Sequence, residues 1–453
     1  MITAPRPPSG TTVGRLASYI EEHRGGRCDE AVRDAALKCV FDLVGSAAAG
    51  FDDAGPAATR SAACELYGTG EVPIWFSGRR STAVGAGWAN GSAAAAMDLD
   101  DGNRWARGHP GAAIVPAAFA VGQEVGAGLE DILTAIVIGY EVGVTVGSAR
   151  TTYGSSGTWT PYGVVAAAAA LRDTPRPQIE HALAIAGESA PNQAFASAPA
   201  PRDPHPEGAA VKEGIPWGVV TGLTAVRLAE AGHTGPRNIL DSGPHYRFPD
   251  GVAPGGDPHI LRTYFKPYAC CRHIHAPLAA LLDLMSRNGI DGRGIETMAV
   301  DIHAAGLRIS NKADPENSVD VQYSIPYVLA LAALHGPETL MPVTAEALGM
   351  PEVVDLARRV SLSLDETFDA VYPETIVARV TIVSGGRRYV SEPTPPAGEP
   401  LMSWDELEQK FDLVTRKAMT EAQRRRMSDA VGALRAGMME PLLECLAEPI
   451  GVR

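Results

Sequence analysis

The order of apolar and polar residues predicts helices along most of the first 260 residues. Apolar side chains recur at helical spacing at Val32, Ala36, Val40 and Leu43. Asp29 is a suitable N-cap for this helix, and the glycines after it predict a loop from Gly45 to Gly55. Residues 164–172 are almost all Val and Ala, so we expect a central helix with close neighbours there. Gly139, Gly143 and Gly147, four residues apart, predict a similarly close helix contact.

The pattern changes after residue 290 and predicts strands. Residues 298–303 alternate between Met298, Val300 and Ile302 on one face and Ala299, Asp301 and His303 on the other. Two short β-like runs flank Gly385-Gly386, which indicates a hairpin. Helices are expected between these strands at 322–334 and 352–360. Residues 295–392 therefore predict an α+β domain.

A return to helix is predicted near the C-terminus. Pro393–Pro400 has the composition of a linker, and Ser403 and Glu406 have the spacing of a capping box. We expect the segment after this linker to rejoin the first domain. A chain of 453 residues is also too long for one ordinary core, which favours two domains.

Charge and composition narrow the possible partners and the cellular location. The net charge is −14 and no long Lys/Arg run occurs, so we expect no nucleic-acid partner. The apolar runs Ala112–Val121 and Ile132–Tyr140 are short and interrupted by Pro116 and Glu141, so no membrane span is expected. The start of the chain lacks a secretory signal, and the six cysteines have no disulfide-like spacing. We predict a cytoplasmic protein.

The most unusual stretch of the sequence is residues 88–113. It places three carboxylates, two guanidinium groups and one imidazole within twelve positions: Asp98, Asp100, Asp101, Arg104, Arg107 and His109. A surface helix would spread such charges over several turns. The crowding around a Gly/Asn bend favours a functional site, while a solvated loop with local ion pairs is the alternative.

A second polar cluster lies at residues 264–275, where Lys266, Arg272, His273 and His275 surround Cys270-Cys271. His273, His275, His109 and the aspartates could form a metal set, but the nearby cations oppose one, so we expect no metal. Dinucleotide, P-loop, calcium-loop and serine-hydrolase motifs are absent from the sequence. Lys212, just before a Gly/Pro break, is a further candidate cation.

These residue types suit proton transfer on a substrate that carries carboxylates. Removal of hydrogen next to a carboxylate needs a base, and the developing negative charge needs fixed cations in a dry pocket. His109, His275 or Lys212 could be the base, and Lys and Arg side chains supply the cations. Each of these groups could instead be a satisfied structural residue, and Tyr327 is more typical of a core position.

Several motifs together resemble the MmgE/PrpD superfamily over nearly the whole chain. They are NGSAAAAMDLDD, HPGAAIVPAAFAVGQ, IGYEVGVTVG, Lys212 with the Gly-rich helix after it, AEAGHTGPRNIL, KPYACCRHIHAPLAAL and VDVQYSIPYVLAL. The resemblance implies a mainly α fold, in which residues 1–266 and 394–453 form a large all-helical domain. Residues 267–393 would form a smaller inserted α+β lid domain, and the chain would be a homodimer.

The resemblance also implies an active site between the two domains, without a metal or organic cofactor. Its catalytic residues would be Asp98, His109, Lys212, His275 and Tyr327, and Arg104, Lys266 and Arg272 would bind the substrate. Two positions depart from the family pattern, at Gly102 and near Tyr153-Gly154, and both lose proton donors. We therefore expect a different acid from aconitate or methylcitrate. His205 could supply a replacement imidazole.

We expect the chain to be a lyase that eliminates water or CO2 from a small di- or tricarboxylate. An isomerase or epimerase would need two acid/base groups on opposite faces of the substrate, for example Lys212 and His275. A scaffold that binds a carboxylate without turning it over is the non-enzymatic alternative.

Overall fold

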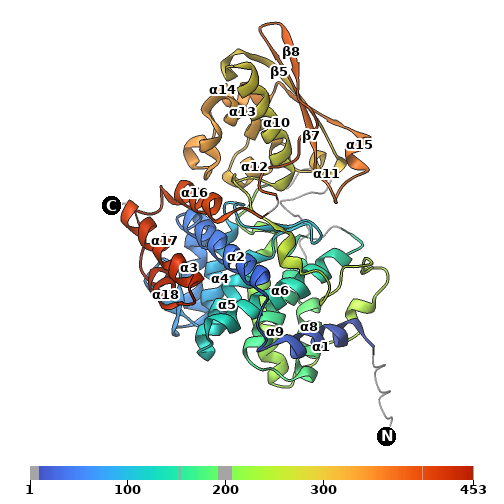
Figure 1. The fold of residues 1–453 in the computed structure, drawn as a ribbon, viewed down its shortest axis with the longest axis vertical. Coiled ribbons are helices and arrows are strands. Elements are labelled where there is room, and N and C mark those ends of the chain that lie inside the picture. Colours follow the sequence, from blue (N-terminus) through green and yellow to red (C-terminus); the bar gives the residue numbers. More distant parts are fainter. Residues whose placement is uncertain (1–9, 153–154, 192–206, 400, 452–453) are drawn as a thin grey trace.

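The computed structural model describes residues 10–152, 155–191, 207–399 and 401–451, and these form two regions with separate large hydrophobic cores (Figure 1). Within these described residues, the helical region contains twelve α-helices. They are α1 Thr12–His23, α2 Glu30–Ala49, α3 Ala54–Tyr67, α4 Ala83–Ala95, α5 Gly111–Val125, α6 Leu129–Ala149, α7 Thr160–Leu171, α8 Arg176–Glu188, α9 Ile215–Glu230, α16 Trp404–Thr415, α17 Glu421–Arg435 and α18 Glu440–Ala447.

The sheet region has a four-stranded sheet with helices beside it (Figure 1). Its helices and strands are α10 Arg272–Asn288, β5 Ile295–Ile302, α11 Ala304–Leu307, α12 Ser318–Gln322, α13 Ile325–His335, α14 Pro351–Ala357, β6 Val360–Leu364, α15 Glu366–Asp369, β7 Ala378–Ser384 and β8 Arg387–Val390. The prediction of a mainly α fold with a smaller α+β part is confirmed. We keep 267 and 393 as proposed domain boundaries.

The strand order is β6-β5-β7-β8, with β5 parallel to β6 and antiparallel to β7. The hairpin prediction is confirmed, because β7 and β8 pair across Gly385 and Gly386, which have φ of 57° and 69°. The alternation in β5 is also confirmed as far as Ile302. His303 departs from it, because the chain leaves the strand there and the imidazole is fully buried.

The central helices pack closely because they lack large side chains. α7 lies against α5, α6 and α9. Gly163 of α7 meets Gly139 of α6 so closely that a Cβ on Gly163 would lie 2.7 Å from the Gly139 carbonyl oxygen. The predicted glycine ridge is therefore a real helix contact.

The predicted loop from Gly45 to Gly55 was wrong, and the residues that interrupt the apolar runs, Pro116 and Glu141, do not end their helices. α2 continues through Gly45 to Ala49, and α3 starts at Ala54, so the predicted loop is much shorter. α5 continues through Pro116. Because proline has no N–H, the Ala112 carbonyl lacks its helical hydrogen bond, and it faces Gly91 of α4. α6 continues through Glu141, whose buried carboxylate accepts the His259 N–H at 2.5 Å.

α6 is the one described helix long and apolar enough to cross a membrane by length and composition. Within that helix, 89% of the most apolar window is buried inside the protein. Its hydrophobicity is therefore explained by its place in the core of the helical region.

The C-terminal helices return to the helical region, where α16 packs against α2 (Figure 1). The predicted capping box is present, with the Ser403 hydroxyl and the Glu406 carboxylate each bonded to the other's backbone N–H. This return brings α16 beside the segment that follows α4.

Two short strands join distant parts of the chain. β3 Gly102–Asn103 pairs antiparallel with β4 Thr263–Tyr264. A Cβ on Gly102 would lie 2.4 Å from the Tyr264 ring, so this close pairing needs glycine at 102. The departure at Gly102 therefore makes room for Tyr264.

Gly163→Ala should lower the free energy of unfolding by about 1–3 kcal/mol, because its methyl group would enter a filled helix contact. Denaturant unfolding followed by circular dichroism measures this change. Gly432→Ala is the matched control, since Gly432 lies in α17 with nothing within 4 Å of its Cβ position, and it should stabilise by about 0.5–1 kcal/mol. Equal effects of the two variants would contradict the packing argument.

Candidate active site

The acidic segment after α4 is buried, which argues against the solvated-loop alternative. Asp98, Asp100 and Asp101 are each only 1% exposed. Asp98 also has a left-handed backbone with φ of 53°, which costs energy for a residue other than glycine. Buried carboxylates need partners, and here the partners come from other parts of the chain.

Asp98 is paired with two lysines. Lys212 Nζ lies 3.0 Å from one carboxylate oxygen, and Lys266 Nζ lies 3.2 Å from the other. Lys212 also donates to the Gln322 side chain at 2.8 Å. Burial alone would raise the pKa of Asp98, but the two ammonium groups hold it well below its ordinary value. Asp98 is therefore a charged anchor for both lysines.

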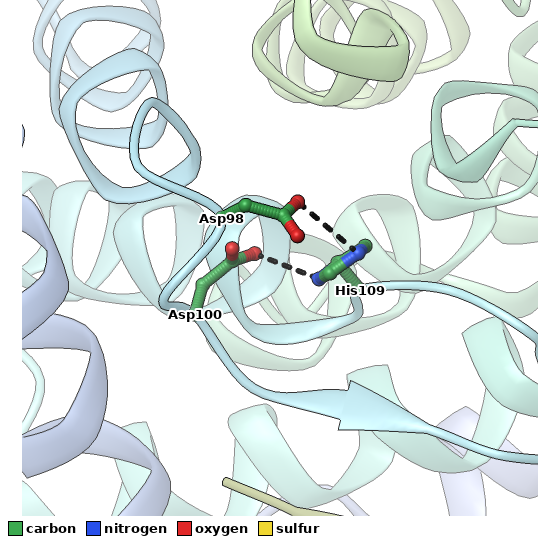
Figure 2. Close-up of side chains that lie close together, drawn as sticks. All are labelled: Asp98, Asp100 and His109. Carbon is green, nitrogen blue, oxygen red and sulfur yellow. Dashed lines mark ion pairs between the residues drawn. The ribbon is translucent and has the colours of Figure 1, made fainter. Parts of the chain in front are cut away.

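His109 lies between Asp98 and Asp100 (Figure 2). Its Nδ1 is 3.3 Å from Asp100 and 3.0 Å from the Asp101 carbonyl oxygen, and its Nε2 is 3.8 Å from Asp98. A carbonyl oxygen only accepts hydrogen bonds, so Nδ1 carries a proton and Nε2 is the nitrogen that can exchange one. Burial and Lys266 lower the pKa of His109, but Asp100 and Asp98 outweigh them and raise it above its ordinary value.

The backbone of the acidic segment is held from behind. The Asp101 carboxylate accepts the Tyr140 hydroxyl at 2.5 Å and the Gly111 N–H at 2.9 Å. Lys410 of α16 donates to the Leu99 carbonyl at 2.8 Å and to Asp42 of α2 at 2.5 Å. Burial raises the pKa of Asp42 to about 6 and that of Asp101 to about 7. The C-terminal helices therefore support a segment placed early in the chain.

Lys212 is positioned by the residue after it. Lys212 and Glu213 have φ of 43° and 57°, and both are buried. The Glu213 carboxylate accepts three hydrogen bonds, from the backbone and hydroxyl of Ser156 at 3.2 and 2.9 Å and from the Tyr323 hydroxyl at 3.0 Å. These bonds stabilise the strained turn that directs Lys212 toward Asp98.

A pocket lies beside His109 and is lined by residues of both regions. Its charged and polar wall residues include Arg104, Arg107, His109, Glu213, Tyr264, Arg272, His273 and Tyr372. Arg104 and Arg272 both pair with Glu399, the latter at 2.7 Å. Arg107 donates to the Arg150 carbonyl and has no carboxylate partner among the described residues. Arg107 therefore contributes uncompensated positive charge.

The predicted site residues are only partly brought together. Asp98, His109, Lys212 and Lys266 form one cluster, and Arg104 and Arg272 line the pocket beside it. Lys266 is fully buried against Asp98 and does not line the pocket.

Two predicted catalytic residues lie away from the pocket wall. Tyr327 is fully buried in the core of the sheet region, where its hydroxyl donates to the Ala347 carbonyl at 2.6 Å. His275 is buried with its Nε2 3.2 Å from the Cys270 carbonyl. Burial and the charges of Arg272 and Lys266 lower its pKa well below the ordinary value, so His275 is neutral. The pocket wall carries His273 instead.

Sequence reasoning missed several residues of the site. Glu213 and Gln322 lie next to or within motifs that the resemblance used, so their position was a usable signal. No local signal pointed to Asp42 and Lys410, because they meet across 368 positions. His205 and the departure at Tyr153-Gly154 lie outside the described residues.

Asp98, Asp100 and His109 offer oxygen and nitrogen atoms within 4.8 Å of one another, a spacing that could hold a metal ion. Both oxygens of Asp98 already face ammonium groups, and Lys266 Nζ is 3.4 Å from the His109 ring. A divalent cation would have to displace or repel these lysines. The donor set therefore favours ammonium partners over a metal.

Comparison with known proteins fits this architecture. Residues 14–260 match the MmgE/PrpD N-terminal domain, and residues 268–435 match the MmgE/PrpD C-terminal domain. The chain belongs to the MmgE/PrpD family. Within this family it is similar to a cis-aconitate decarboxylase of Aspergillus terreus, with 27% identity over 82% of this chain and 83% of the relative. A second cis-aconitate decarboxylase, from Aspergillus terreus strain NIH 2624, is 28% identical over the same shares.

Asp100→Asn should lower the pKa of His109, because it removes a carboxylate that stabilises the protonated ring. The raised pKa means that protonated His109 stabilises the fold at low pH, and this contribution is lost as pH rises through that pKa. NMR titration of labelled histidines measures the shift. Asp250→Asn, at an exposed position, is the control and should leave the pKa unchanged. An unshifted His109 in Asp100→Asn would contradict the assigned contact.

Lys410→Met should destabilise the protein by about 3–5 kcal/mol, because it leaves the Asp42 carboxylate buried without a counter-charge. Denaturant unfolding measures the loss. Lys417→Met removes an exposed pair with Glu346 and should cost at most about 1 kcal/mol. If Asp42→Asn restores none of the stability lost in Lys410→Met, the ion pair is not the cause.

Proposed function

We propose that this MmgE/PrpD protein is a lyase that removes CO2 from a small di- or tricarboxylate without a metal or organic cofactor. The family, the named activity of two relatives and the cationic pocket support this proposal. The observation that carries it is His109, held at the pocket wall between two carboxylates that favour its protonated form.

The charges of the pocket favour a substrate with several carboxylates. Arg107 is uncompensated, and Arg104 and Arg272 share the single carboxylate of Glu399. The protein as a whole has a net charge of −14, so a local excess of cations is needed to attract an anion. Guanidinium groups bind carboxylates through paired hydrogen bonds, which fixes the orientation of the acid.

In the proposed reaction the bond between carbon and the departing carboxylate breaks, and its electron pair stays on the carbon. His109 then gives its Nε2 proton to that carbon. Fixed cations in the pocket stabilise the negative charge while it exists. Lys212 and Lys266 hold Asp98 charged, so Asp98 keeps the imidazole in place.

Decarboxylation needs an acid at this position, whereas dehydration and epimerisation also need a base. Glu213 is the one carboxylate among the described pocket-wall residues, and both of its oxygens already accept hydrogen bonds from Ser156 or Tyr323. This supports decarboxylation over the other two reactions. Water elimination is the second candidate reaction, because it could use the same proton donor, His109.

The purified protein should be incubated in D2O with a panel of di- and tricarboxylic acids that includes cis-aconitate. Release of CO2 with one deuterium in the product supports the proposal. Loss of water would make the protein a dehydratase, and deuterium in recovered substrate would make it an isomerase. No change in any acid, together with a thermal shift on binding, would indicate a scaffold.

His109→Gln should lower kcat about 10²–10⁴-fold, because it removes the proton donor while the cations that bind the substrate remain. Steady-state kinetics on the acid identified above measures this loss, and KM should change much less. His233→Gln, at an exposed position, is the control. A His109→Gln variant with wild-type kcat would show that another group supplies the proton.

We further propose that the chain acts as a cytoplasmic homodimer. The resemblance described above is the support for the dimer. Light scattering during size-exclusion chromatography would measure the mass of the assembly.

A further inference from the structure

A second pair of histidines adjoins the pocket from the sheet region. His273, in the first turn of α10, lines the pocket, and its Nδ1 lies 2.9 Å from Nε2 of His303. The Tyr372 ring, also on the pocket wall, stacks on His303 with 4.5 Å between ring centres and an angle of 11°. The proposed reaction leaves this cluster without a role.

The contact between the two rings can be made in two ways. If His303 donates, His273 carries its own hydrogen on Nε2, and His303 Nδ1 is left as a bare acceptor. If His273 donates, its Nε2 is bare, and His303 carries a hydrogen on Nδ1. His303 Nδ1 is buried without a hydrogen-bond partner among the described residues.

The burial of His303 Nδ1 decides between the two arrangements. A buried N–H without a partner is rarer in proteins than a buried acceptor without one. His303 is therefore the donor, and His273 has its hydrogen on Nε2. That nitrogen has no hydrogen-bond partner among the described residues, so it is available to a molecule in the pocket.

The surroundings keep both rings uncharged. Burial lowers the pKa of His273 to about 3, with smaller contributions from the neighbouring His303, which opposes protonation of both rings together, and from the charges of Arg308 and Arg272. Burial also lowers the pKa of His303 to about 4, although Asp369 opposes this shift. When both rings are neutral, one of the two facing nitrogens can carry a hydrogen and the other can accept it, as the contact requires.

We propose that His273 is a further catalytic residue, a neutral imidazole that donates its Nε2–H to a carboxylate oxygen of the substrate, and that His303 is the residue that positions it. This inference rests on the proposed function for the identity of the substrate. The oxygen it binds belongs to the carboxylate that stays on the product. No proton leaves His273, since His109 supplies the one that is transferred.

A neutral donor is useful at this place because negative charge grows on the retained carboxylate as CO2 departs. A fixed N–H stabilises that charge more in the transition state than in the bound substrate. Neutral imidazole is known to serve as such a donor.

The direct test is the tautomer of His273 in the wild-type protein. NMR of nitrogen-labelled histidines at neutral pH should show a neutral His273 with hydrogen on Nε2, and His303 with hydrogen on Nε2 as well. A His273 with hydrogen on Nδ1, or a charged ring, would overturn the inference. This measurement needs no substrate, so it separates failure of this inference from failure of the proposed function.

The kinetic test compares two replacements of His303. His303→Gln keeps an N–H that can reach His273, whereas His303→Leu does not. His273→Phe should lower kcat about 100-fold, as expected for loss of one donor to a developing oxyanion. His303→Leu should lower kcat by a similar factor with little change in KM, and His303→Gln should recover most of it.

His335→Gln is the matched control, because His335 lies at the end of α13 and pairs with Glu352 outside the pocket. It should leave kcat unchanged. If His303→Leu and His303→Gln are folded and equally active as wild type, His303 does not position a catalytic group. If His273→Phe keeps the wild-type kcat, His273 is not catalytic.

Discussion

The ion pairs of Asp98 are the constraint on which the rest of the site depends. A carboxylate that is 1% exposed is stable only when counter-charges lie against it, and Lys212 and Lys266 provide them at 3.0 and 3.2 Å. These three residues come from separate segments of the chain. Asp98 and Lys212, for example, are 114 positions apart. The pairing therefore fixes where the segment after α4, the turn before α9 and the segment before α10 meet. His109 takes its position from that meeting point, where Asp100 and Asp98 raise its pKa.

Strain in the backbone accompanies this arrangement. Asp98, Arg107, Lys212 and Glu213 all have positive φ, and all four lie in the cluster or on the pocket wall. Such conformations are stable only when the surrounding contacts impose them. The hydrogen bonds of Glu213 and the ion pairs of Asp98 do this. The same contacts that hold the side chains in place thus offset the cost of the turns that present them.

The sequence was most informative where the pattern was regular or the residues were crowded. The alternation in β5, the hairpin at Gly385 and the charged stretch around His109 could all be predicted, because each depends on neighbours along the chain. The burial of Glu141 inside its helix could not be predicted, because its partner, His259, is distant in sequence. Tyr327 was placed in the site by the resemblance, and His275 by its residue type and the resemblance, but the structure buries both away from the pocket wall. His273, two positions before His275, faces the pocket. The sequence could not show which of the two histidines does so, because both lie in the first turn of α10.

The contact of Lys410 with Asp42 and Leu99 affects the order in which the molecule can form. Asp42 and the acidic segment are synthesised early, but α16, which carries their counter-charge, is among the last helices to leave the ribosome. Until then the growing chain has no way to bury the Asp42 carboxylate without great cost. The helical region therefore gains this counter-charge only after α16 has been made, and the acidic segment that carries Asp98 is supported by the end of the chain as well as by its beginning.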